Sequence, residues 1–246
     1  MPSLCHRPAS MPAAIALAIF LSACAADRAA APTASPFVSV ATQPANVGDA
    51  RTAALAYRNS GAYDRDVAEI AAQAGRWLAG RAAGVARPAL VLDIDETALS
   101  NWEVILRDDF GRPIAGPCDP AGKGPCGWAA WDQLGRDPAI GPTLALFRQA
   151  RAAGVAVFFI TGRPESQRAA TERNLAAGGY RGYARLAMVP DGAHFTSAAE
   201  FKAPVRAAIE GEGYTIVANV GDQPSDLAGG HAQRAFLLPN PFYRVP

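Results

Sequence analysis

The segment Ala-Leu-Val-Leu-Asp-Ile-Asp-Glu-Thr, residues 89–97, decides the fold. Its first four residues are apolar and its end is acidic, and a short continuous apolar run is typical of a strand buried on both faces of a parallel sheet. Because alternate side chains of an extended chain point the same way, we expect Asp93 and Asp95 to lie on one side. Two carboxylates so close to each other repel unless a cation or a shared proton lies between them.

The rest of the chain continues this pattern of apolar strands and amphipathic helices. Further strands are expected at 155–161, 185–189, 214–220 and 234–239, and helices at 48–60, 62–84, 143–154, 164–179 and 197–213. Such alternation predicts an α/β fold, a parallel sheet with helices on both faces. In sheets of this kind the active site lies beyond the carboxyl ends of the strands.

Two more of the predicted strands end in polar residues. Thr161 and Gly162 follow the apolar run 155–160, and Asp222 and Asp226 follow the run 214–220. The chain has only two lysines, and one of them, Lys202, lies on the helix that precedes Asp222. Each of these features alone is weak, since acidic residues often cap turns and a helical lysine usually faces solvent. Their order at successive strand ends points to a shared site.

The residue types at this site suit phosphoryl transfer. Asp93 and Asp222 offer the oxygen ligands that Mg²⁺ prefers, while Thr161, nearby backbone N–H groups and Lys202 can bind phosphoryl oxygens. A carboxylate can attack phosphorus to form an aspartyl phosphate. A second carboxylate two residues later, Asp95, can protonate the leaving group and then activate water.

The motifs DIDET (93–97), FFITGR (158–163), the helical lysine and GDQPSD (221–226) resemble the four motifs of the haloacid dehalogenase (HAD) superfamily. Over residues 50–246 the chain resembles the class B-like acid phosphatases, which include plant acid phosphatases, vegetative storage proteins and bacterial lipoprotein phosphatases. This resemblance implies a HAD-like Rossmannoid core with a small cap insertion at about 99–137. It implies that Asp93 is the nucleophile and Asp95 the general acid and base. Thr161, Gly162 and Lys202 would bind phosphate, and Asp93, Asp222 and the backbone carbonyl of Asp95 would bind Mg²⁺. Asp226 would orient Lys202 or a water beside the metal.

The expected function is the hydrolysis of small-molecule phosphomonoesters by a Mg²⁺-dependent acid phosphatase, with nucleoside monophosphates among the candidate substrates. The alternatives are a degenerate binding or storage protein and a phosphotransferase that uses alcohols. Asp95 favours hydrolysis, and the retained nucleophile Asp93 argues against storage alone. Four aromatic residues of the insertion are assigned to no regular element, and we expect them to form a small core in which one or two stack on an aromatic leaving group: Trp102, Phe110, Trp128 and Trp131.

Charge and cysteine content limit the partners. A formal net charge of +1 gives no support to binding of a nucleic-acid polymer, and the sequence predicts no oligomeric state. Cys118 and Cys126 lie in a Gly/Pro-rich loop that favours a disulfide. A zinc site is the competing interpretation, but no His or further Cys lies nearby to complete it.

The N-terminal residues resemble an export signal. Residues 1–23 contain an apolar run that ends in Leu-Ser-Ala before Cys24, which resembles a bacterial lipobox and predicts lipidation of Cys24. Residues 24–48 are expected to form a flexible tether, and residues 49–246 the phosphatase domain. These features predict a lipoprotein of the bacterial cell envelope, anchored in the outer membrane and facing the periplasm, with a soluble secreted or periplasmic protein as the alternative.

Overall fold

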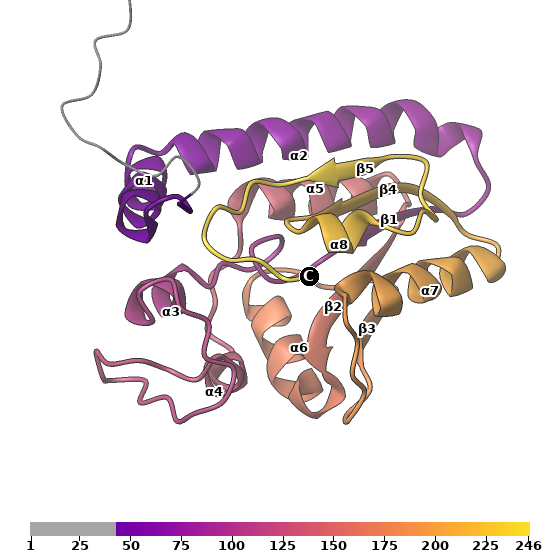
Figure 1. The fold of residues 1–246 in the computed structure, drawn as a ribbon. Coiled ribbons are helices and arrows are strands. Elements are labelled where there is room, and N and C mark those ends of the chain that lie inside the picture. The colour runs from indigo at the N-terminus through magenta and orange to yellow at the C-terminus, as the bar shows by residue number, and fades with distance from the viewer. Residues whose placement is uncertain (1–42) are drawn as a thin grey trace, which may run out of the picture. The chain divides into compact units, whose positions relative to one another are not determined.

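A computed structural model describes residues 43–246, and residues 45–246 form one compact unit. The core of this unit is a sheet of five strands in the order β3-β2-β1-β4-β5 (Figure 1). Every strand pair in it is parallel. The strands are β1 (Pro88–Leu92), β2 (Ala156–Pro164), β3 (Arg185–Val189), β4 (Thr215–Gly221) and β5 (Ala235–Leu237). The predicted parallel α/β fold is confirmed.

Helices cover both faces of the sheet because the central strands are apolar on both sides. Leu90 and Leu92 of β1 belong to one buried cluster, and the alternate residues Ala89 and Val91 belong to a second. The helices α2 (Ala62–Arg81) and α5 (Gly141–Ala152) supply the first cluster, whereas α7 (Ala198–Gly211) supplies the second. In Figure 1, α2 and α5 lie on the opposite side of the sheet from α7.

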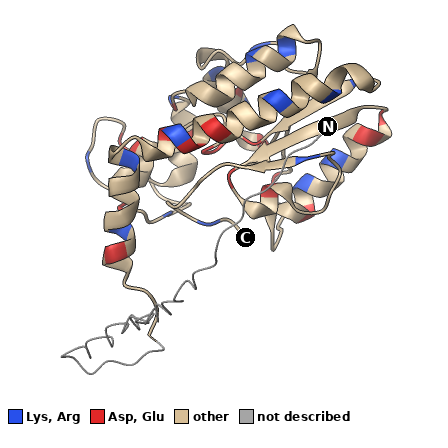
Figure 2. Cartoon of the chain, turned by 90° about the horizontal axis from the view of Figure 1, so that it is seen from above, with Lys and Arg blue, Asp and Glu red and all other residues tan. Residues whose placement is uncertain are grey.

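The remaining helices are short or peripheral. They are α1 (Val47–Asn59), α3 (Trp102–Arg107), α4 (Trp128–Leu134), α6 (Arg168–Ala177) and α8 (Pro224–Leu227), with 3-10 turns at Ala82–Gly84 and Glu165–Gln167. Because α1 begins at Val47, the last two residues of the predicted tether are helical. In the described residues, basic and acidic positions are interspersed along the helices (Figure 2), so no broad basic face is visible in this view.

The insertion between β1 and α5 is more ordered than the sequence predicted. Trp102 is the first residue of α3, and Trp128 and Trp131 lie in α4, so the expectation that these aromatics belong to no regular element is wrong. Each of these helices has fewer than two turns. Hydrophobic periodicity cannot be recognised over so short a stretch.

Candidate active site

The acidic motif leaves the sheet through a tight turn. The backbone N–H of Asp93 still donates to the carbonyl of Val220 in β4, at 3.0 Å. The next turn is closed by the amides of residues 97–99, which all donate to the carbonyl oxygen of Ile94 at 2.8–3.2 Å. Glu96 has a φ of 52°, in the left-handed region that residues other than glycine rarely adopt. Strained backbone of this kind is concentrated at functional sites.

Lys202 is buried among the carboxylates that follow the strands, so the solvent-facing interpretation of this lysine is wrong. Its Nζ atom lies 2.5 Å from Oδ1 of Asp93 and 2.7 Å from Oδ1 of Asp226, and its side chain is 5% exposed. Burial opposes the charge of Lys202, but the carboxylates of Asp93 and Asp226 outweigh burial and raise the pKa of Lys202. The lysine therefore remains cationic at the centre of the site.

Three buried carboxylates meet beside this lysine. One oxygen from each of Asp93, Asp222 and Asp226 lies within 4.8 Å of the others. Burial and the neighbouring carboxylates raise the pKa of Asp93 to about 7, although Lys202 opposes the shift. Burial and Asp93 also raise the pKa of Asp222 well above its ordinary value. A hard cation would relieve this repulsion, and the oxygen donors fit Mg²⁺.

The carboxylate of Asp222 is held in place from three directions. Oδ1 accepts a hydrogen bond from the hydroxyl of Thr97 at 3.3 Å. Oδ2 accepts hydrogen bonds from the side-chain amides of Gln223 and Asn240, each at 2.6 Å. Asn240 lies after β5, so the C-terminal segment fixes a residue at the end of β4. No sequence motif signalled this support.

The close packing of Asp226 against the end of β4 depends on a glycine. A Cβ atom at Gly221, the last residue of β4, would lie 2.5 Å from Cβ of Asp226. Asp226 belongs to the short helix α8, and its Oδ2 accepts a hydrogen bond from the backbone N–H of Gln223 at 2.9 Å. The family resemblance assigned Asp226 to the orientation of either Lys202 or a water beside the metal, and Asp226 is in direct contact with Lys202.

Asp95 lines the same cavity as Asp93, but its carboxylate is paired with a cation. Nη2 of Arg163 lies 2.6 Å from Oδ1 of Asp95, and Asn101 donates to the same oxygen at 2.9 Å. Burial alone would raise the pKa of Asp95, but Arg163 and Asn101 outweigh it and lower that pKa. The carboxylate of Asp95 thus lies outside the cluster formed by Asp93, Asp222 and Asp226.

Arg163 is a site residue that the sequence analysis missed. It is 3% exposed, and Nη2 also lies 3.3 Å from Asp132 of α4 and 3.3 Å from Asp137. Three carboxylates thus surround one guanidinium. FFITGR contains this arginine, but neither of the two additional partners lies in a recognisable motif. Both come from the insertion and reach Arg163 only through the tertiary fold.

Thr161 and Gly162, which the sequence predicted to bind phosphate, lie near the end of β2. Thr161 is fully buried, and its hydroxyl oxygen accepts a hydrogen bond from the backbone N–H of Arg163 at 3.1 Å. Gly162 is exposed and lines the same cavity as Asp93, Lys202 and Asp222. The structure therefore brings the strand ends of β1, β2 and β4 to one cavity of about 360 Å³.

Of the four aromatic residues predicted to serve the cap, only Trp128 lines this cavity. Its ring packs edge-on against Tyr243, at 5.2 Å between centroids, and Tyr243 also lines the cavity. Trp102 and Phe110 instead pack around Phe242. Trp131 donates from its indole to a carboxylate oxygen of Asp137 at 2.6 Å.

Tyr243 connects the C-terminal segment to the acidic motif. Its hydroxyl donates to Oε2 of Glu96 at 2.6 Å, while the backbone N–H of Asn101 donates to Oε1 at 2.6 Å. Burial raises the pKa of Glu96 to about 8. Glu96 thus supports the turn from a buried position, a role that its place in the DIDET motif did not predict.

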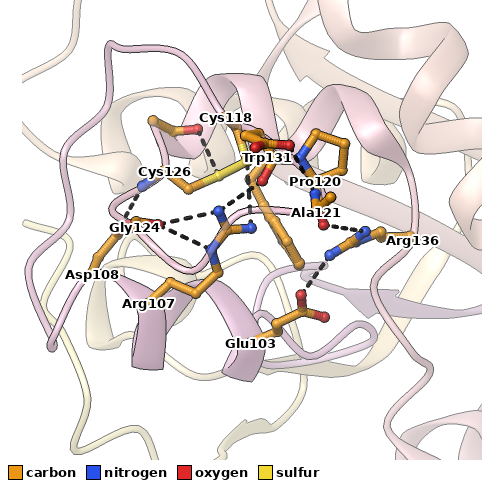
Figure 3. The surroundings of a disulfide bond; sticks show 12 residues. Glu103, Arg107, Asp108, Cys118, Pro120, Ala121, Gly124, Cys126, Trp131 and Arg136 are labelled. Atoms are coloured by element: carbon orange, nitrogen blue, oxygen red, sulfur yellow. Dashed lines mark hydrogen bonds and ion pairs between the residues drawn. A yellow bond between two sulfur atoms is a disulfide. The ribbon is translucent and has the colours of Figure 1, made fainter.

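A disulfide anchors the loop that borders the cavity on the insertion side. Cys118 and Cys126 are joined, and Arg107 of α3 donates to the backbone carbonyls of residues 119 and 124 at 2.8 and 3.1 Å (Figure 3). Arg112 lies in the segment that joins α3 to Cys118, and its guanidinium carbon lies 4.9 Å from the centroid of the Trp128 ring. The disulfide and Arg107 thus hold residues 118–126, while Pro113, next to Arg112, accepts a hydrogen bond from the backbone N–H of Trp128 at 2.7 Å.

The arrangement defines the class of protein. A parallel sheet whose central strands end in carboxylates, with a buried lysine from the next helix and an insertion after the first strand, is the architecture expected of a HAD-type phosphatase. Residues 14–246 match the family model described as HAD superfamily, subfamily IIIB (acid phosphatase). The chain belongs to this family and is a phosphoric monoester hydrolase.

Individual relatives agree with this assignment. The chain is 31% identical over 185 residues to "Acid phosphatase 1" of Solanum lycopersicum, covering 74% of this chain and 69% of that protein. It is 36% identical over 158 residues to the "Stem 28 kDa glycoprotein" of Glycine max and 30% identical over 157 residues to "Vegetative storage protein 1" of Arabidopsis thaliana. Each of these two matches covers 63% of this chain, and they cover 59% and 55% of those proteins.

A solved structure shares the fold. The class C acid phosphatase from Bacillus anthracis superposes with a TM-score of 0.63 at 19% identity. The superposition covers 80% of this chain and 85% of that chain.

The relatives contradict the predicted localisation. They are plant proteins, named as an acid phosphatase, a stem glycoprotein and a storage protein. The prediction of a bacterial outer-membrane lipoprotein is therefore wrong, and it depended on a four-residue motif after an apolar run that an ordinary cleaved signal also contains. The signal 1–23, Cys24 and most of the tether lie outside the described residues. Within residues 43–246, no helix combines the length and hydropathy that a membrane span requires.

Proposed function

We propose that the chain is a Mg²⁺-dependent acid phosphatase that hydrolyses small phosphomonoesters through an aspartyl phosphate on Asp93. The observation that carries the proposal is the contact of the Lys202 ammonium with both Asp93 and Asp226, beside Asp222. A nucleophilic carboxylate, a fixed cation and further carboxylates then face one cavity. This set serves phosphoryl transfer, in which positioning and charge neutralisation provide most of the catalysis.

In the first step an oxygen of Asp93 attacks phosphorus and the bond from phosphorus to the ester oxygen breaks. Asp95 gives its proton to the departing oxygen, so the alcohol leaves neutral. In the second step Asp95 accepts a proton from water, which attacks phosphorus and releases phosphate from Asp93. The N–H groups at Thr161 and Gly162, together with Lys202, bind the phosphoryl oxygens during both steps.

Magnesium would be held by Asp93, Asp222 and the backbone carbonyl of Asp95. Its contribution is to neutralise the negative charge of the phosphoryl oxygens. The role of this chain's own residues is to keep those ligands in place. Asp226 holds the lysine, while Thr97, Gln223 and Asn240 hold Asp222.

An acidic working range follows from the pairing of Asp95 with Arg163. Since the arginine lowers the pKa of Asp95, the proton that the leaving group needs is present only in acidic solution. The turnover of esters with poor leaving groups should therefore fall as the pH rises toward neutrality. Esters with good leaving groups depend less on this proton, so their turnover should fall less over the same pH range.

Esters with a flat leaving group suit the aromatic side of the cavity. Trp128 and Tyr243 line it, and the guanidinium of Arg112 lies over both rings. Nucleoside monophosphates and aryl phosphates present planar groups that can pack against such rings. They are the first substrates to test.

Two other functions are compatible with the same fold. The names of the storage relatives favour a storage protein, against which stand the retained Asp93, Asp95 and Lys202. Transfer of the phosphoryl group to an alcohol would use the same first step, with an alcohol in place of water. Release of phosphate from a panel of monoesters at acidic pH, with chelator or Mg²⁺ and with or without added alcohol, separates the three. Phosphate release that requires Mg²⁺ supports the proposal, no release supports storage, and a phosphorylated alcohol as the main product supports transfer.

A further inference from the structure

One carboxylate of the cavity has no part in the proposed reaction. Asp132 belongs to α4 of the insertion, lines the cavity that contains Asp93, and is 4% exposed. Neither of its carboxylate oxygens accepts a hydrogen bond within the described part of the chain, and Oδ1 is fully buried beside Arg163. Buried carboxylates are normally hydrogen-bonded, since desolvation without partners costs free energy. Burial raises the pKa of Asp132 to about 8, although Arg163 opposes the shift. A hydrogen-bond donor bound in the cavity would stabilise the ionised form that burial disfavours.

The pairing of Asp132 with Arg163 is too weak to account for its burial. Nη2 of Arg163 lies 3.3 Å from Oδ1 of Asp132 without a hydrogen bond, whereas the guanidinium donates to Asp95, at 2.6 Å from Nη2, and to Asp137. Asp137 competes for the same nitrogen at 3.3 Å and has the indole of Trp131 as a second partner. Asp132 is thus the least satisfied of the three carboxylates.

The position of Asp132 in the cavity places it near the leaving group of a bound substrate. Because Oδ1 is fully buried beside Arg163 and the residue lines the cavity, we expect a bound molecule to reach Oδ2. Asp132 comes from the insertion, next to Trp128, whereas the groups that would bind phosphate come from the strand ends. A phosphomonoester whose phosphoryl group lies at Asp93 and Lys202 would therefore extend its leaving group toward Asp132.

We propose that Asp132 is a specificity-determining residue that accepts a hydrogen bond from a donor on the leaving group, a hydroxyl or an ammonium. This inference rests on the proposed phosphatase function. The preferred substrates are then phosphomonoesters of alcohols that carry a second polar group with N–H or O–H. Simple alkyl esters leave the carboxylate without its partner and bind less well.

A matched set of three esters tests this proposal: propyl phosphate, 3-hydroxypropyl phosphate and 3-aminopropyl phosphate. With the wild-type protein, kcat/KM for at least one of the two donor-bearing esters should exceed that for propyl phosphate by about tenfold or more, since sites built for a hydrogen bond discriminate against analogues that lack it. In Asp132→Ala this ratio should fall to about one. Asp132→Asn keeps an acceptor, so it should retain preference for the hydroxyl and lose any additional preference for the ammonium.

Asp137→Asn is the matched control, because Asp137 contacts the same nitrogen of Arg163 but does not line the cavity. Its ratios should equal those of the wild type. A wild-type ratio near one, or an Asp132→Ala ratio equal to that of the wild type, overturns the proposal. An equal change of the ratios in the Asp132 and Asp137 variants also overturns it, because Asp132 would then act only through Arg163.

Binding of the corresponding phosphonates, which cannot be hydrolysed, separates this inference from the proposed function. The Kd of 3-hydroxypropylphosphonate or 3-aminopropylphosphonate for the Mg²⁺-loaded wild type, measured by calorimetry, should be about tenfold below that of propylphosphonate. If the phosphonates show this difference but no ester is hydrolysed, the function is wrong and the inference stands. If the esters are hydrolysed but all the phosphonates bind equally, the function stands and the inference is wrong.

Discussion

The ammonium of Lys202 lies 2.5 Å from the carboxylate of Asp93, although 109 residues separate them in the sequence. Both side chains are buried, so the pair replaces the water that each ion would otherwise bind. Asp226 shares the lysine at 2.7 Å. The nucleophile, the cation and one more carboxylate therefore form a unit whose members depend on one another both for stability and for their proposed roles.

Removal of the lysine should damage stability as well as activity. Lys202→Met leaves Asp93 and Asp226 as buried carboxylates without a cation, a change that typically costs about 3–5 kcal/mol. We expect the urea midpoint to fall and phosphate release to be lost. The matched control is Lys123→Met, which changes the exposed second lysine of the chain and should alter neither. Equal urea midpoints for the wild type and Lys202→Met would show that Lys202 does not hold the cluster together.

The metal requirement can be measured at Asp222. Asp222→Ala removes one of three converging carboxylates, so we expect the Mg²⁺ concentration for half-maximal activity to rise at least about tenfold. The chelated wild type should be inactive and recover with Mg²⁺. Full activity of chelated protein that contains no metal by elemental analysis would contradict this assignment.

The pH dependence of stability should contain a contribution from Glu96. Burial raises its pKa from 4.5 to about 8, so the folded state binds a proton that the unfolded state releases between these values. The free energy of unfolding should therefore fall as pH rises through this window. Glu96→Gln resembles the protonated form and should flatten the slope. Urea unfolding at pH 5 and pH 8 in chelator measures both slopes, and parallel slopes would show that Glu96 is ionised throughout.

Reduction of the disulfide should loosen the border of the cavity. The bond closes a short loop between Cys118 and Cys126, for which the loss of chain entropy in the unfolded state amounts to about 2–3 kcal/mol. Reductant should lower the melting temperature of the wild type and leave the doubly substituted Cys118→Ser/Cys126→Ser protein unchanged. Arg112 lies outside the closed loop, in the segment that joins α3 to Cys118, so we also expect KM to rise more than kcat falls. A reductant effect that persists in the double variant would assign it to another cause.

The sequence predicted the sheet and three of the strand ends because those signals are local. An apolar run followed by a polar residue marks the end of a parallel strand, so Asp93, Thr161 and Asp222 could be placed at one edge before the structure was known. Lys202 could be placed only on a helix, since periodicity does not reveal whether one lysine turns inward.

The rest of the site depends on contacts between distant segments. Asp132 and Asp137 reach Arg163 from an insertion with little periodicity, and Tyr243 reaches Glu96 from 147 residues away. The four-residue helix α8, which positions Asp226, is too short to produce a periodic signal. Such contacts follow from the packing of the whole domain, so no local pattern announces them.

The most direct test of the account is Asp93→Asn, which removes the nucleophile with almost no change in size. Phosphate release from an aryl phosphate at acidic pH, with Mg²⁺ present, should fall by at least about 10³-fold, while the circular dichroism spectrum remains that of the wild type. Rapid acid quenching with labelled substrate should trap a phosphorylated wild-type protein and no phosphorylated variant. A folded Asp93→Asn protein that turns over at close to the wild-type rate would contradict the aspartyl-phosphate mechanism.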